Sequence, residues 1–323
     1  MGMLINGQWE TTTPLTTNDE QGRFIRPDTQ FRSWITEDGC SGYKAEPERY
    51  HLYVSYACPW ACRTLIMRSL KGLENIISVS IVEPLMLENG WEFGSKEQGT
   101  VDTVNHANYL YEIYLKADIN YTGKVTVPLL WDKYTKTIVN NESAEIMRML
   151  NSEFNAYARN TYDFYPKVLH KQINELNEFI YKNINNGVYQ CGFAKTQMVY
   201  DEAVERLFSA LDTLEERLSQ SRYLFGDILT ETDWRLFTTL IRFDVVYVTH
   251  FKCNLKRIED YSYLPSYLRN LYQIPGIKQT VNFFHIKEHY YRSQKILNPS
   301  GIIPKGPIID FARPRDIAKN RIA

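Results

Sequence analysis

The chain has 323 residues, with 37 Lys and Arg against 38 Asp and Glu, and therefore a formal net charge of −1. A balance this even argues against a nucleic-acid-binding protein, which needs a strongly basic face, and against a polybasic membrane-surface protein. The length predicts about two domains, and an apolar content of 44% with 14% aromatic residues is typical of a globular protein.

Two features bear on location. No stretch approaches the roughly 18 apolar residues of a membrane-spanning helix, and the first residues lack the basic and apolar regions of a signal peptide. The 5 cysteines are odd in number and scattered, which is typical of a reducing compartment rather than of a disulfide framework. We therefore expect a soluble cytoplasmic protein.

Residues 1–47 are polar and rich in turn-forming residues, and we expect an N-terminal extension anchored by Phe31 and Trp34. The β-branched and aromatic run at 51–56 then predicts a buried strand. A helix is predicted to begin at Pro59, and the apolar run at 76–82 predicts a second strand. Strand, helix and strand in this order are typical of the crossover unit of a parallel α/β sheet.

Residues 83–122 are interpreted as a longer insertion rich in Tyr, Asn and Gly. Strand character returns at 125–131, where Pro128 cannot donate to a sheet ladder, so a turn with a cis peptide bond is one resolution. Residues 137–139 complete a hairpin, and a helix is predicted to begin at residues 140–143.

Beyond about residue 151 the strand patterns end and helical periodicity takes over. Apolar residues at helical spacing predict helices over 166–181, 196–218, 264–271 and 281–291. Thr230 and Asp233 have the spacing of a capped start for a further helix. The fold class predicted is a small α/β domain followed by a larger all-α domain.

Cys58 lies between the first predicted strand and helix, in the sequence Cys58-Pro-Trp-Ala-Cys62-Arg63. The helix dipole and free N–H groups there stabilise a thiolate, and such positions lower a thiol pKa from roughly 8.5 to about 3.5–7.5. A thiolate suits thiol–disulfide chemistry, whereas the alternative is a structural buried cysteine. Cys62 lies one helical turn deeper and is interpreted as a packed bystander, with a resolving role or a disulfide left open.

A rival motif is His285-Ile-Lys-Glu288-His289, which matches the H-x-x-E-H pattern of some zinc peptidases. The motif is short and no third ligand is evident, so we expect no metal site. We interpret the two histidines as exposed residues on a helix surface.

Further motifs accompany Cys58 nearly from end to end of the chain. They are Arg49–Leu73, Gly90–Phe93, Lys124–Asp132, Val139–Glu145, Gly192–Ala194, Tyr223–Asp227, Arg235–Phe237, Arg242–Asp244, His289–Tyr291 and Asn298–Pro307. In this set and order they resemble the xi-class glutathione transferases, the glutathionyl-hydroquinone reductases.

The resemblance implies a thioredoxin-like glutathione-binding domain at 48–152, after the extension at 1–47, and an all-helical glutathione-transferase C-terminal domain with a tail at 160–323. It also implies glutathione as co-substrate, a homodimer, and neither nucleic acid nor membrane as partner. Cys58 would attack the sulfur of a glutathionyl-hydroquinone. The hydroquinone would leave, and a second glutathione would release oxidised glutathione from the mixed disulfide.

The resemblance implies further site residues. The positions that match its glutathione contacts are Trp91, Lys124, Val127, Pro128, Glu142 and Ser143. Lys124 stands where the family often has Arg, and a Lys lacks the bidentate geometry toward a carboxylate. For the leaving hydroquinone the resemblance points to Tyr189 and Tyr290 as hydrogen-bond donors and to Tyr291 as a substrate contact.

Two alternatives stay open beside the reductase. One is an omega-like thioltransferase or dehydroascorbate reductase, which the extended motifs and His289-Tyr290-Tyr291 disfavour. The other is a ligand-binding protein with a glutathione-transferase-like fold and no turnover. A missing cysteine or a degraded glutathione site would favour that alternative, and the sequence has neither.

Overall fold

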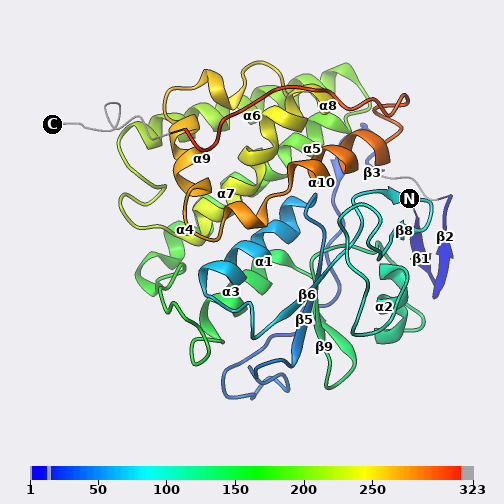
Figure 1. The fold of residues 1–323 in the computed structure, drawn as a ribbon. Helices are drawn as coiled ribbons and strands as arrows, with labels where there is room; N and C mark the ends of the chain where they lie inside the picture. The colour runs from blue at the N-terminus through cyan, green and yellow to red at the C-terminus, as the bar shows by residue number, and fades with distance from the viewer. Residues whose placement is uncertain (1, 13–15, 314–323) are drawn as a thin grey trace. The chain divides into compact units, whose positions relative to one another are not determined.

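The computed structural model describes residues 2–12 and 16–313 (Figure 1). The chain divides into two compact units. The first comprises Met1–Leu15, Pro27–Tyr162 and Thr280–Gln294, and the second comprises Thr16–Arg26, Asp163–Gln279 and Lys295–Ala323. Parts of the predicted extension and tail, at 13–15 and 314–323, lie outside the described residues. The predicted domain boundaries, 48–152 and 160–323, stay a prediction.

A four-stranded sheet forms the centre of the first unit, in the order β10-β9-β5-β6 (Figure 1). Its strands are β5 (Tyr50–Val54), β6 (Ser78–Ile81), β9 (Leu129–Asp132) and β10 (Thr137–Asn140). Strand β5 is buried along its whole length and pairs parallel with β6 and antiparallel with β9. Helix α1 (Pro59–Leu70) connects β5 to β6, which confirms the predicted crossover.

The ends of α1 follow from its sequence. Pro59 occupies the first turn, where its missing N–H leaves no hydrogen bond unmade. After the last helical residue, Gly72 has a φ of +66°, a left-handed conformation that glycine adopts at no steric cost. The helix therefore stops where the predicted helix does, and the chain turns into β6.

The stretch at 83–122, interpreted above as an insertion, contains regular structure. Strands β7 (Met86–Leu87) and β8 (Gly90–Trp91) form a hairpin, and helix α2 (Leu110–Ala117) follows. The Glu112 carboxylate accepts a hydrogen bond from the Tyr109 amide at 3.2 Å, which satisfies one donor at the helix start. Only two turns long and rich in tyrosine, α2 offers too short a periodic pattern to stand out in the sequence.

The N-terminal segment contains two short hairpins, β1 (Met3–Ile5) with β2 (Gln8–Glu10) and β3 (Thr17–Asn18) with β4 (Phe24–Ile25). Phe31 stacks on Tyr121 with ring centroids 5.6 Å apart, so it anchors the segment as predicted. Trp34 is only half-buried, and its neighbour Ile35 is the fully buried residue.

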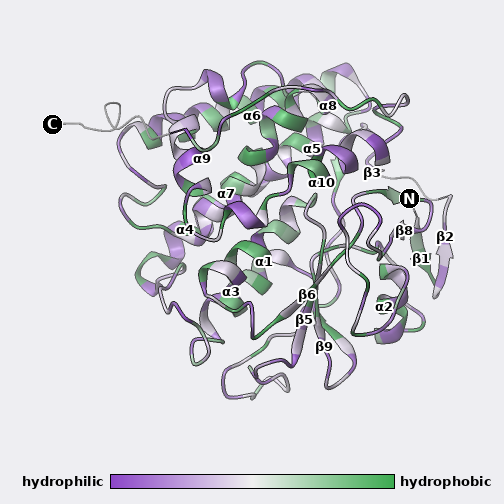
Figure 2. Cartoon of the chain, in the orientation of Figure 1, coloured by the Kyte–Doolittle hydropathy of each residue, from purple (hydrophilic) through white to green (hydrophobic). Residues whose placement is uncertain are grey.

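The second unit is helical. Its main helices are α4 (His170–Ile180), α5 (Gly187–Gly192), α6 (Gln197–Ser219), α7 (Glu231–Arg242), α8 (Val248–His250) and α9 (Leu264–Tyr272). Both hydrophobic and hydrophilic residues occur along these helices, as expected of amphipathic helices (Figure 2). Asp233 accepts from the Thr230 amide at 2.8 Å, which confirms the predicted capped start of α7.

The predicted helix at 281–291 corresponds to α10 (Phe283–Glu288), which continues as one turn of π-helix, η6 (His289–Ser293). Both belong to the first unit. Within residues 2–12 and 16–313, no helix combines the length and hydropathy needed to cross a bilayer.

Two glycines of α5 give a matched test of packing. A Cβ at Gly192 would lie 2.3 Å from Cδ1 of Phe251, whereas a Cβ at Gly187 would meet Leu207 Cδ1 at 3.7 Å and the Lys182 carbonyl oxygen at 4.0 Å, both ordinary contacts. We expect Gly192→Ala to lower the free energy of unfolding by roughly 1–3 kcal/mol through overpacking. Gly187→Ala is expected to raise it by up to about 1 kcal/mol through helix propensity. Urea unfolding of both variants checks the pair, and equal effects would contradict it.

Candidate active site

Cys58 is the residue before the first turn of α1, just beyond the C-terminal end of β5. Its backbone is extended, with φ −76° and ψ 122°, while its carbonyl accepts the first helical hydrogen bond, from the Cys62 amide at 3.0 Å. The side chain is half-buried, and its thiol donates to the Val127 carbonyl at 3.5 Å. A sulfur atom at this position faces the partial positive charge of a helix N-terminus.

The segment opposite Cys58 carries backbone groups suited to a peptide ligand. The Val127–Pro128 peptide bond is cis, the geometry that the sequence suggested for this proline. Thr126, the residue before Val127, is held by Tyr114, whose hydroxyl donates to the Thr126 carbonyl at 2.9 Å. Among the described residues, no group accepts a hydrogen bond from the Val127 amide. A backbone donor therefore lies beside the Cys58 thiol.

Helix α3 (Ser143–Ser152) begins at two further predicted glutathione contacts, Glu142 and Ser143. The Glu142 carboxylate caps the helix by accepting from the Ala144 amide at 3.1 Å, and it also accepts from the Ser143 hydroxyl at 3.4 Å. Glu142 is half-buried and Ser143 is 3% exposed. A helix start with a hydroxyl at its first position binds carboxylates well.

Arg63 is a residue of this site that the sequence analysis did not single out. Its side chain extends from α1, is 2% exposed, and donates from Nη1 to the Ser143 hydroxyl oxygen at 3.4 Å. The guanidinium carbon also lies 4.5 Å from the centroid of the Trp60 ring. Arg63 thus adds a positive charge beneath the first turn of α3. The signal in the sequence was a basic residue among the apolar positions of the predicted helix.

The two remaining predicted glutathione contacts differ in environment. Lys124 is half-buried, and burial lowers the pKa of its ammonium group. Trp91, in β8, is 6% exposed and stacks on His289 with ring centroids 4.8 Å apart. His289 is held in turn by the Pro84 carbonyl, 3.1 Å from its Nδ1. Trp91 therefore leaves only a small part of its surface exposed to solvent.

The predicted tyrosines fall in different units. Tyr290 and Tyr291 lie in η6 of the first unit, the unit of Cys58, and each is 2% exposed. Tyr189 lies in α5 of the second unit, where the Arg26 guanidinium lies 4.7 Å from its ring centroid. All three side chains are largely buried and expose little surface to solvent.

The two histidines of the H-x-x-E-H motif are buried, which corrects the prediction that they are exposed. His285 is 0% exposed and His289 is 8% exposed. His285 packs edge-on against Tyr56, and burial lowers the pKa of its imidazole. In the part of the chain that the structure describes, no three His, Cys, Asp or Glu residues form a group that could hold a metal ion.

Cys62 is fully buried, and its thiol donates to the Thr280 carbonyl at 3.6 Å. All five cysteines are free thiols. Cys62 is therefore packed as predicted, while its role as a bystander stays a prediction.

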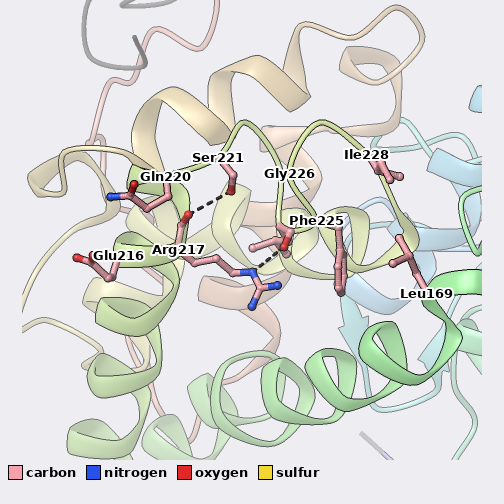
Figure 3. A pocket seen from close by; sticks show the side chains of 9 residues that line it. Leu169, Glu216, Arg217, Gln220, Ser221, Phe225, Gly226 and Ile228 are labelled. Carbon is pink, nitrogen blue, oxygen red and sulfur yellow. Dashed lines mark hydrogen bonds between the residues drawn. The ribbon is translucent and has the colours of Figure 1, made fainter. Parts of the chain in front are cut away.

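The second unit contains a separate cavity of about 510 Å³ (Figure 3). It lies beside the C-terminal end of α6, where the Arg217 side chain donates to the Leu224 carbonyl at 2.6 Å. Phe225 and Ile228 contribute apolar surface to its lining. None of the predicted site residues lines this cavity, so we do not assign the chemistry of Cys58 to it.

Two family models match the chain. The model described as "Glutathione S-transferase, N-terminal domain" matches residues 57–153, and the model described as "Glutathione S-transferase, C-terminal domain" matches residues 197–270. The first match contains the Cys58 segment and the start of α3, and the second contains α6 and α7. Together they confirm the predicted fold class, a thioredoxin-like domain followed by an all-helical one.

Curated relatives match along nearly the whole chain. "Glutathionyl-hydroquinone reductase YqjG" of Escherichia coli is 55% identical over 326 residues, covering 98% of this chain and 99% of the relative. "Glutathionyl-hydroquinone reductase PcpF" of Sphingobium chlorophenolicum is 48% identical over 307 residues, covering 95% of this chain and 96% of the relative.

Solved structures agree with these matches. The glutathione-bound structure of YqjG from Escherichia coli has a TM-score of 0.90 at 53% identity, covering 98% of this chain and 100% of that one. The structure of "Xi Class GST from Natrialba magadii" has a TM-score of 0.91 at 48% identity, covering 98% and 96%.

Proposed function

Because the chain belongs to the xi-class glutathione transferases, the family of the glutathionyl-hydroquinone reductases, we propose that it reduces glutathionyl-hydroquinones with glutathione. The observation that carries the proposal is the 55% identity, over nearly the full length, to a curated reductase of this kind. The half-buried Cys58 thiol at the start of α1 supports it, because the reaction needs an accessible sulfur nucleophile.

The proposed reaction has two steps. The Cys58 thiolate attacks the glutathionyl sulfur, the bond from that sulfur to the ring carbon breaks, and the ring carbon takes a proton, so the free hydroquinone leaves. Two sulfur atoms are thereby oxidised to a mixed disulfide, while the ring carbon is reduced. A second glutathione thiolate then attacks the mixed disulfide, which releases oxidised glutathione and restores the Cys58 thiolate.

We assign the glutathione contacts to groups that are available for them. The Val127 amide and carbonyl would pair with the cysteinyl part of glutathione, and the cis Pro128 fixes this segment. The Ser143 hydroxyl and the N-terminus of α3 would bind the γ-glutamyl carboxylate, with the Glu142 carboxylate toward the ammonium group. Trp91 and Lys124 would complete the site, with Lys124 acting through charge.

We assign the aromatic part of the substrate to Tyr189 and Tyr290, whose hydroxyls would donate to the leaving hydroquinone, with Tyr291 as a further contact. We also propose a homodimer, on the family resemblance. A cytoplasmic location fits a reaction that consumes reduced glutathione and a chain whose five cysteines are free thiols.

The proposed function is tested by supplying glutathione and a glutathionyl-hydroquinone and measuring free hydroquinone and oxidised glutathione. We expect equal amounts of the two products. Dehydroascorbate and a mixed disulfide, supplied separately, test the omega-like alternative, and faster turnover of either would favour it. Glutathione binding without any turnover would overturn the reductase and favour a ligand-binding protein. Size-exclusion chromatography with light scattering tests the dimer.

Ser143→Ala tests the assignment of the carboxylate site. Removing a hydroxyl that donates to a charged group costs about 1.5–3 kcal/mol, so we expect the KM for glutathione to rise about tenfold or more with little change in kcat. Ser152→Ala is the matched control, because Ser152 lies at the exposed far end of the same helix. Equal KM values in the two variants would refute the assignment.

A further inference from the structure

A cavity of about 590 Å³ lies in the first unit, away from the residues assigned to glutathione. Its lining includes Lys116 near the end of α2, Lys133 just after β9 and Lys136 just before β10. No described residue that lines it is acidic. Its volume falls within the roughly 300–1,000 Å³ of small-molecule sites.

The positive charge of this cavity is not neutralised by the surrounding protein. Among the described residues, no carboxylate lies within ion-pair distance of the three lysines, whereas the exposed Lys96 pairs with Glu92 at 2.7 Å. The nearby Asp102 is fully buried. Its oxygens accept from backbone amides within residues 104–107 and from the Tyr53 hydroxyl, at 3.0–3.2 Å. Three cations therefore gather in a chain whose net charge is −1.

Neutral groups complete the lining. Ser78 and Thr103 contribute hydroxyls, and Trp131, which is 1% exposed, also lines the cavity. Beneath Ser78 lies His51, whose Nδ1 is 2.7 Å from the Ser78 hydroxyl and whose Nε2 is 2.9 Å from that of Ser80. Burial lowers the pKa of His51 to about 4, so this residue positions Ser78 without adding charge near pH 7.

The cavity is distinct from the site of Cys58. His51 pairs with Ser78 near the N-terminal end of β5, whereas Cys58 follows the C-terminal end of the same strand. None of the residues assigned to glutathione or to the hydroquinone lines the cavity.

We propose that this cavity binds a small phosphorylated compound, whose phosphates lie among Lys116, Lys133 and Lys136. Ammonium groups and hydroxyl donors recognise phosphate, and three unpaired cations match an anion with more than one charge. A small molecule is favoured over a nucleic acid, because the cavity is of ligand size and the net charge of the chain is −1. The proposal does not depend on the reductase activity.

Calorimetry with two probes, inorganic pyrophosphate and ADP, tests this binding in the intact protein. The cavity variant combines Lys116→Gln, Lys133→Gln and Lys136→Gln. The matched control combines Lys171→Gln, Lys182→Gln and Lys278→Gln, which removes the same charge from exposed lysines outside the cavity. Thermal unfolding and hydroquinone release, both expected to be unchanged, show that the cavity variant is folded.

We expect saturable binding of at least one probe to the wild type, weakened by added salt and at least tenfold weaker in the cavity variant only. Tighter binding of ADP than of pyrophosphate identifies a nucleotide as the ligand, and the reverse identifies an inorganic phosphate. No saturable binding of either probe, or an equal loss in both variants, overturns the proposal.

Discussion

Cys58→Ser is expected to lower kcat/KM for hydroquinone release at least about a thousandfold, because removal of a covalent nucleophile leaves only binding and orientation. Serine has nearly the same shape, yet its hydroxyl does not ionise near neutral pH and cannot form a disulfide with glutathione. Glutathione binding, measured by calorimetry, is expected to persist, since the Val127 backbone and the start of α3 are untouched. The wild type treated with substrate alone is expected to carry one glutathione on Cys58 by mass spectrometry.

Cys62→Ser is the matched control for this experiment. Cys62 is fully buried, and a serine hydroxyl can donate to the Thr280 carbonyl as the thiol does. We therefore expect its activity to stay within a small factor of the wild type. Activity that survives in Cys58→Ser and disappears in Cys62→Ser would move the nucleophile to Cys62.

Asp132→Asn is expected to lower the free energy of unfolding by about 3–5 kcal/mol, the cost of leaving one partner of a buried ion pair without the other. Asp132 has a side chain that is 0% exposed and binds Arg49 through both oxygens, at 3.0 and 2.7 Å. The Thr135 hydroxyl donates to the same carboxylate at 2.7 Å. Urea unfolding near pH 7 measures the loss.

The loss is expected to depend on pH. Burial by itself raises the pKa of Asp132, but the hydrogen bonds from Arg49 and Thr135 outweigh it and hold that pKa below its usual value. The contribution of the carboxylate is therefore complete above its unfolded pKa of about 3.9 and is lost as the pH falls through the lower folded pKa. The difference between wild type and Asp132→Asn should shrink in that acid range.

Glu92→Gln provides the comparison for the Asp132 variant. Its partner Lys96 has a side chain that is 74% exposed, and solvent screening leaves such exposed pairs a small contribution to stability. A loss from Glu92→Gln as large as that from Asp132→Asn would show that burial of the ion pair does not govern its contribution.

The elements with a local cause could be predicted from the sequence. The strand before Cys58, the helix that begins at Pro59 and the capped start of α7 each follow from residues that are neighbours in the chain. Helix α2 could not be predicted, because its apolar face is only two turns long. Hydrophobicity favours Trp34 as the anchor of the N-terminal segment, but the residue that is fully buried there is its neighbour Ile35.

The site is harder to derive from sequence, because burial of a polar residue depends on distant partners. Histidine is a polar residue that sequence analysis places on the surface. His289 nevertheless packs on Trp91 and on the carbonyl of Pro84, which lies 205 positions away. Arg63 likewise meets Ser143 through the packing of α1 against α3, 80 positions apart. Periodicity indicates which face of a helix is apolar, but not which polar side chain that face admits.

The grouping of Thr280–Gln294 with the first unit has a consequence for folding during synthesis. The ribosome makes residues 163–279, the main part of the second unit, before this segment, so the first unit stays incomplete while that part emerges. Until then Trp91 lacks the imidazole on which it stacks, and the Met86 amide lacks the Ser293 hydroxyl, its acceptor at 3.0 Å. A nascent chain that stalls before residue 280 therefore holds an incomplete first unit for as long as it pauses.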